Sequence, residues 1–144
     1  MNGSVNGDIT NRLVVAAVTR DHTEIWAVLD NDPHPIITVK RPAEREFSHI
    51  GKAQEHHMHR TDRNDEVYFK QVAKVLLPAS EIMLVGHGKG DSNAMESFAE
   101  YFRDHHPLEF KKVSELRYAN LPALTGGEIV KLAHHWKNQQ KTTG

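Results

Sequence analysis

Six consecutive apolar residues, Leu13 to Val18, stand between polar turn residues near the start of the chain. The run is short for a helix, and both sets of alternate residues are apolar, as in a strand covered on its two faces. The sequence therefore predicts a layered fold built on a sheet, with this strand in its interior.

Two more strand segments follow the first. Thr23 to Leu29 is rich in β-favouring residues, and Ile36 to Val39 is a short apolar run. The polar stretch 19–22 and the Pro-containing stretch 31–35 separate the three segments and indicate turns. We expect an antiparallel meander.

After Pro42 the pattern changes, because residues 43–64 show neither helical nor strand periodicity over most of their length. Beyond this connection, helical spacing of apolar residues alternates with short apolar runs. The expected elements are a helix over Asp65–Leu77, a strand over Ile82–Val85, a helix containing Met95, Phe98, Ala99 and Phe102 that Pro107 ends, an edge strand over Lys111–Tyr118, and a helix opened by the capping-box spacing of Thr125 and Glu128.

The element order is thus βββ-α-β-α-β-α. Short connections after Pro78 favour parallel strands joined by crossovers and added to the antiparallel meander. The predicted class is α/β, with a five-stranded mixed sheet, three packed helices and the architecture of ribonuclease H-like folds. We expect one domain over 12–136, a disordered tail over 1–11 and a frayed tail over 137–144.

Composition excludes several kinds of chemistry. The 144 residues include no Cys, which excludes thiolate metal sites, a thiol nucleophile and disulfides. The formal net charge is −1, and no apolar run is long enough to span a membrane. The expectation is a soluble cytoplasmic protein without a cofactor and without a membrane partner.

A two-metal nuclease needs carboxylates at the ends of its central strands. The strand Leu13–Val18 contains no acid, and the strand Ile82–Val85 runs into Gly86 and His87. The sequence therefore argues against nuclease activity. Turns or an exposed strand face explain the remaining acids, which are Asp21, Glu24 and Asp30.

A glycine-rich segment lies between a predicted strand and a predicted helix. Its anion-binding candidates are Gly86, Gly88, Lys89, Gly90 and Ser92. Backbone N–H groups at such a junction can bind a phosphate, and Lys89 could reach it. The alternative is a tight glycine turn followed by a capping residue, since the Walker A spacing is absent.

Three histidines are clustered at His56, His57 and His59. Imidazoles at this density could bind zinc, nickel or copper, although the spacing matches no familiar metal site. A solvated polar loop explains the same residues. Contact with nucleic acid through partly protonated imidazoles is the third interpretation.

The window Lys40 to Arg63 contains six Lys or Arg, four Asp or Glu and four His, in a chain that is slightly acidic overall. A basic connection carried on a rigid sheet suits RNA phosphates, whereas a solvated surface is the alternative. The predicted RNA-binding residues are Arg41, Arg45, Lys52, His56, His57, His59, Arg60, Arg63 and Lys89.

Several segments together resemble small bacterial proteins that are related to the middle domain of eukaryotic and archaeal peptide-release factors and Pelota. The matching segments are Gly51 to Arg60, Asp65 to Leu77, Ile82 to Ser92, His105 to Pro107 and Leu124 to Ile129. The resemblance implies a ribonuclease H-like fold and a role in translation. Its expected partners are the ribosome or tRNA and rRNA, with no DNA partner.

In release factors the corresponding connection carries Gly-Gly-Gln, which positions water for ester hydrolysis. Here Gly51-Lys52-Ala53-Gln54 occupies that interval, and Gly126-Gly127-Glu128 belongs to a helix start. The tripeptide is missing, as it is in Pelota, which serves in ribosome rescue. Gln54 remains a catalytic candidate in this interval.

These observations favour a non-catalytic RNA- or ribosome-associated module that binds through the loop 40–63. A second hypothesis is a hydrolase of an ester or a phosphate-bearing substrate, with Gln54 or a loop histidine positioning water. A third is a metal-binding protein that uses His56, His57 and His59, or a purely structural protein with a protein partner.

Overall fold

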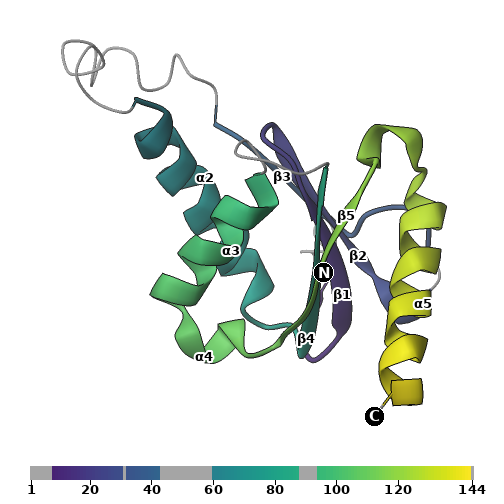
Figure 1. Cartoon of the computed structure of the whole chain (residues 1–144). Helices are drawn as coiled ribbons and strands as arrows, with labels where there is room; N and C mark the ends of the chain where they lie inside the picture. Colours follow the sequence, from purple (N-terminus) through teal and green to yellow (C-terminus); the bar gives the residue numbers. More distant parts are fainter. Residues whose placement is uncertain (1–7, 31, 43–59, 88–93, 144) are drawn as a thin grey trace.

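The computed structural model describes residues 8–30, 32–42, 60–87 and 94–143, without the side chains of 60–64 and 141–143. A five-stranded sheet lies between two helical layers (Figure 1). Helices α2 (Arg60–Leu76), α3 (Ala94–His105) and α4 (Pro107–Phe110) cover one face, and α5 (Gly126–Thr143) covers the other. Among the described residues, no helix is both long and apolar enough to cross a membrane.

The sheet has the order β3-β2-β1-β4-β5. Its strands are β1 (Leu13–Val18), β2 (His22–Ala27), β3 (Ile37–Lys40), β4 (Glu81–His87) and β5 (Val113–Ala119). Strand β2 is antiparallel to β1, and β3 is antiparallel to β2. Strand β4 is parallel to β1, and β5 is parallel to β4. The predicted mixed α/β sheet, with Leu13–Val18 at its centre, is confirmed.

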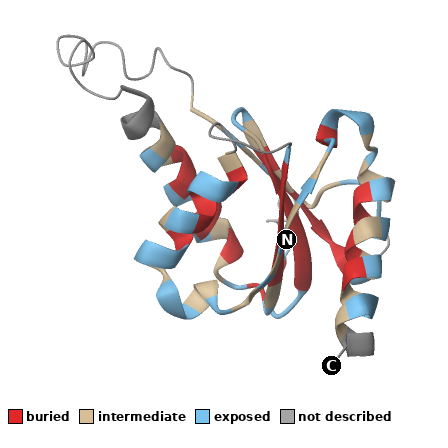
Figure 2. Cartoon of the chain, viewed as in Figure 1, coloured by how far each residue is buried: buried red, intermediate tan, exposed pale blue. Residues whose placement is uncertain are grey.

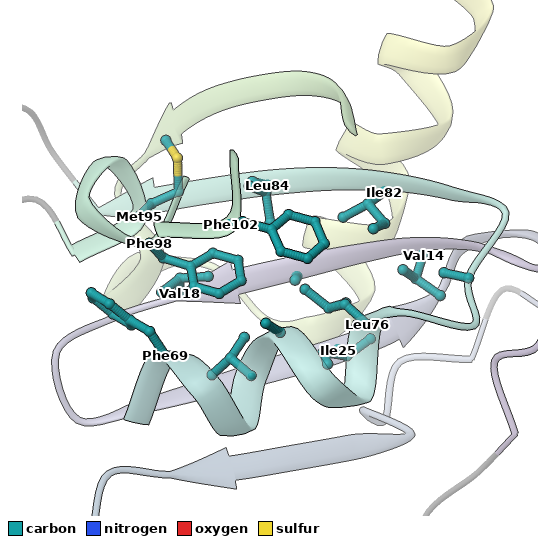
Figure 3. Close-up of a cluster of buried hydrophobic side chains, with 14 of the residues drawn as sticks. Val14, Val18, Ile25, Phe69, Leu76, Ile82, Leu84, Met95, Phe98 and Phe102 are labelled. Carbon is teal, nitrogen blue, oxygen red and sulfur yellow. The ribbon is translucent and has the colours of Figure 1, made fainter. Parts of the chain in front are cut away.

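Alternate residues of β1 enter two separate apolar clusters. Val14, Ala16 and Val18 face α2 and α3, while the other three residues of the strand face α5. All six are buried, because both faces of the strand are covered (Figure 2). Figure 3 shows the larger cluster, in which side chains of three strands meet Phe69 and Leu76 of α2 and residues of α3.

The helix count differs from the prediction of three. Pro107, expected only to end a helix, also begins the short helix α4. Proline suits the first turn of a helix, where its fixed φ is already helical and its missing N–H costs no hydrogen bond. The four-residue helix was therefore missed.

Both predicted tails are too long where the structure describes them. Ile9 is 2% exposed and belongs to the larger core, and the Asn11 N–H donates to the Pro78 carbonyl at 2.8 Å. At the other end, α5 continues to Thr143. Lys137 pairs with Glu81 at 2.8 Å, which ties this last part of the helix to the sheet.

The start of α5 follows the predicted capping box. The Thr125 N–H donates to Glu128 Oε1 at 2.9 Å, and the Glu128 N–H donates to Thr125 Oγ1 at 3.2 Å. Gly126 lies so close to the β2–β3 loop that a Cβ there would be 2.0 Å from the Pro33 carbonyl oxygen. That carbonyl accepts a hydrogen bond from Trp26 Nε1, so the glycine allows helix, loop and strand to meet.

Candidate functional site

The C-terminal ends of the parallel strands lie at one end of the sheet, and we call this end the carboxyl edge. Its described residues are the turn 19–22 after β1, residues 40–42 at the end of β3, His87 at the end of β4 and Ala119 at the end of β5. The first turns of α2 and α3 lie at the same edge (Figure 1). Ligands of open α/β sheets bind beyond this edge, because the loops that follow the strands meet there.

A buried tyrosine organises the carboxyl edge. The Tyr68 hydroxyl lies 2.8 Å from Thr23 Oγ1 and donates to the Thr19 carbonyl at 2.9 Å. Both Tyr68 and Thr23 are fully buried. These bonds join α2 to the β1–β2 turn and satisfy polar groups that would be costly to bury unpaired.

Arg41 covers this tyrosine from outside. Its guanidinium lies 4.9 Å from the centre of the Tyr68 ring, pairs with Asp65 at 2.5 Å and donates to the Arg20 carbonyl. Burial raises the pKa of Tyr68 to about 12, against the smaller opposing effects of the Thr23 hydrogen bond and the Arg41 charge. Tyr68 is therefore neutral at physiological pH and serves as a hydrogen-bonding group.

The contacts of Arg41 change how its predicted role in RNA binding is understood. Its side chain is 20% exposed and holds the chain after β3 against both α2 and the β1–β2 turn. In the described structure Arg41 is thus a positioning residue for the connection that follows it. No local sequence pattern indicates this role, because Asp65 and Tyr68 are more than twenty residues away.

An open depression of about 580 Å³ lies beside Arg41. Its lining consists of Asp21, His22, Glu24, Thr38, Lys40, Arg41 and Pro42. His22 is opposite Lys40, and Glu24 is opposite Thr38, across the β2–β3 ladder. Charges of both signs alternate on this surface, so it has the character of a polar rim and not of a cationic pocket. No sequence motif marks His22 and Lys40 as a pair, because their contact depends on the register of β2 against β3.

The predicted anion loop begins later than expected. Gly86 is buried within β4, paired with Val18 and Tyr118, and the strand continues through His87. Gly86 therefore belongs to the sheet, where a parallel ladder on both sides fixes its backbone. Gly88, Lys89, Gly90 and Ser92 lie outside the described residues.

Helix α2 begins at Arg60, five residues before the predicted start. Arg60 and Arg63 are therefore helical and are not loop residues, although their side chains are not described. Six further predicted site residues lie outside the described part of the chain, namely Arg45, Lys52, Gln54, His56, His57 and His59. The structure establishes the two ends of their segment, Pro42 and Arg60.

The described acids do not form a metal centre. Within ranges 8–30, 32–42, 60–87 and 94–143, no group of three or more His, Asp or Glu side chains is placed to bind a metal ion. Asp30 pairs with Arg12 at 2.6 Å, at the end of the sheet opposite Asp21. Asp21 and Asp30 are thus too far apart to act on one ion.

Comparisons of the sequence with protein-family models and curated proteins, and of the fold with solved structures, find no significant match.

Proposed function

We propose that the protein is a non-catalytic RNA-binding module of the translation machinery, and that it contacts RNA at the carboxyl edge. The supporting observation is one of placement. The basic connection leaves the sheet after β3 and returns at α2, and the glycine segment leaves after β4 and returns at α3. Both predicted contact segments are therefore anchored at the same edge of the sheet.

The connection 40–63 is held firmly where it leaves β3. Arg41 is fixed by Asp65, Tyr68 and the Arg20 carbonyl, and Tyr68 is fixed by Thr23 and the Thr19 carbonyl. The window 40–63, with six Lys or Arg against four Asp or Glu, is thus held at its two ends by β3 and α2, an arrangement suited to binding phosphates.

The resemblance to the middle domain of release factors and Pelota supports the setting of this proposal. The sheet order β3-β2-β1-β4-β5, with only β2 antiparallel to the central strand, also fits the ribonuclease H-like fold that the resemblance implies. The proposed partners are the ribosome, tRNA or rRNA, and the proposed location is the cytoplasm.

The test is a triple variant, Lys52→Ala, Arg60→Ala and Arg63→Ala. Each phosphate contact that is lost should lower the log–log slope of RNA affinity against salt by about 0.7–0.9. We expect weaker binding to all RNA sequences and less co-sedimentation with ribosomes, with an unchanged melting temperature.

A matched control removes three exposed cations at the end of the molecule opposite the carboxyl edge, namely Lys74, Arg103 and Lys111. It changes the net charge equally, so only a localised contact surface distinguishes the two triple variants. Equal loss of affinity in both would contradict a contact at the carboxyl edge.

The other hypotheses give different outcomes in the same experiment. Unchanged RNA affinity and salt slope in the first variant would remove the connection from RNA binding. Ester hydrolysis that is lost in Gln54→Ala would then favour the hydrolase. A zinc-induced rise in melting temperature that is lost on replacing His56, His57 and His59 would favour the metal-binding protein.

A further inference from the structure

Strand β5 forms an unpaired edge of the sheet. It is seven residues long and is paired only with β4 among the described strands (Figure 1). Alternate N–H and C=O groups along such a strand point away from the sheet and can bind another strand. The opposite edge strand, β3, has four residues and ends in the exposed Lys40, a composition that discourages strand addition.

The two faces of β5 differ in chemistry. On the α5 face, Glu115 and Arg117 form an ion pair at 2.7 Å, and the Arg117 guanidinium lies 5.2 Å from the Trp136 ring centre. On the α3 face, Leu116 is 47% exposed and Tyr118 is 41% exposed. These two are among the few large apolar side chains that the described structure leaves open to solvent.

The order of these residues is self-complementary. Consider an antiparallel pair of β5 strands with a twofold axis through Leu116. Each residue before Leu116 in one copy then faces the residue equally far after Leu116 in the other copy. Glu115 is then opposite Arg117 of the second copy, and Arg117 is opposite Glu115 of that copy. Leu116 meets its own equivalent on the other face, and Ser114 lies opposite Tyr118.

We propose that β5 is a homodimerisation edge, at which a second copy of this chain adds its own β5 in antiparallel register about Leu116. The two sheets then join into one continuous sheet. The interface gains main-chain hydrogen bonds, a contact between two exposed leucines and two reciprocal pairs of opposite charge. A closed twofold pairing also covers the free β5 strand of both copies at once.

This pairing sets the geometry of the assembly. Because the β5 strands run antiparallel, the two carboxyl edges lie at opposite ends of the joined sheet. The proposed RNA-binding surfaces remain open in the dimer and face away from each other. The dimer proposal does not depend on the proposed function, and its tests use no RNA.

Charge reversal tests the proposed register. Glu115→Arg places two arginines against two arginines, and Arg117→Glu places two glutamates against two glutamates. Each single variant should sediment as one chain at concentrations where the parent sediments as two. An equimolar mixture of the two variants restores opposite charges at every position and should recover the two-chain species.

Two further proteins separate loss of pairing from loss of folding. The double variant Glu115→Arg, Arg117→Glu restores both the internal ion pair and the pairs across the axis, so it should dimerise alone. Arg103→Glu introduces the same charge change as Arg117→Glu, at an exposed site on α3, and should leave the dimer unchanged. Circular dichroism checks that every variant is folded.

Cross-linking locates the axis, since the parent chain has no Cys. Leu116→Cys places two thiols directly opposite and should form an intermolecular disulfide on mild oxidation. Ser114→Cys, exposed on the same strand, lies opposite Tyr118 and should not. A parent that sediments as one chain at every concentration, or efficient cross-linking of Ser114→Cys with none of Leu116→Cys, would overturn the proposal.

Discussion

Tyr68 illustrates how a single side chain fixes the carboxyl edge. Its hydroxyl bonds to Thr23 Oγ1 and the Thr19 carbonyl inside the core. We expect Tyr68→Phe to lower the free energy of unfolding by about 1–3 kcal/mol, because buried polar groups lose their partner while the ring is kept. Tyr101→Phe on α3 is the comparison, since its ring is only partly buried. Equal losses in the two variants, measured by urea denaturation, would contradict this role.

The raised pKa of Tyr68 predicts a specific alkaline instability. An unfolded tyrosine ionises near pH 10, whereas Tyr68 in the folded protein ionises near pH 12. The stabilisation is therefore complete below pH 10 and is lost as the pH rises from 10 to 12, by at most about 2–3 kcal/mol. The measurement is the difference in unfolding free energy between parent and Tyr68→Phe across this range. A difference that does not change with pH would contradict the burial of the hydroxyl.

Two neighbouring glycines should respond in opposite ways to alanine. In Gly126→Ala the new Cβ would be 2.0 Å from the Pro33 carbonyl oxygen, so the helix start or the loop must move. We expect a loss of about 2 kcal/mol or more in unfolding free energy. In Gly127→Ala the nearest atom is 3.6 Å away, and the helical position should gain up to about 1 kcal/mol. Thermal melting of both variants checks the difference in sign.

At the scale of elements, α5 depends on its cap and on its contacts along the sheet. Thr125→Ala removes the hydroxyl that accepts from the Glu128 N–H and should cost about 1 kcal/mol. Thr125→Ser keeps the hydroxyl and should cost much less. Loss of the same stability in both variants, measured by thermal melting, would indicate that the methyl group matters and the cap does not.

Most elements could be predicted from the sequence because their apolar periodicity is strong. The strand Leu13–Val18 has the predicted bounds, and the capping box at Thr125 forms as expected. The errors occur where contacts distant in sequence extend an element. Lys137 pairs with Glu81 across the molecule, and Ile9 packs into the core, so the packed structure includes described residues on both sides of the predicted domain bounds.

At the scale of the whole molecule, the location of the candidate site follows from sheet topology. The order of strands predicts that the basic connection and the glycine segment share an edge. The tyrosine and arginine contacts beneath that edge could not be predicted, because Tyr68 and Arg41 reach partners in separate elements. The sequence predicts Tyr68 within a helix and Arg41 as an RNA contact, and neither prediction includes these long-range bonds.

The proposed RNA contact also predicts a dependence on pH. An imidazole with an ordinary pKa of about 6.5 is largely charged at pH 6 and neutral at pH 8. Replacing His56, His57 and His59 with Ala should therefore weaken RNA binding at pH 6 more than at pH 8. Replacing His134 and His135 on α5 is the control and should have the same small effect at both values. A histidine cluster variant whose affinity ratio does not change with pH would contradict a charged role for these side chains.

The places where the described chain starts and stops have a practical consequence. Asn11 is bonded to the Pro78 carbonyl, just before β4, and the last turns of α5 lie beside Glu81 at the beginning of that strand. Asn11 and Lys137 therefore lie at the sheet margin opposite the proposed RNA surface. A fluorophore coupled to an exposed side chain of this margin would leave that surface unobstructed, so the module can be labelled without masking the contact under study.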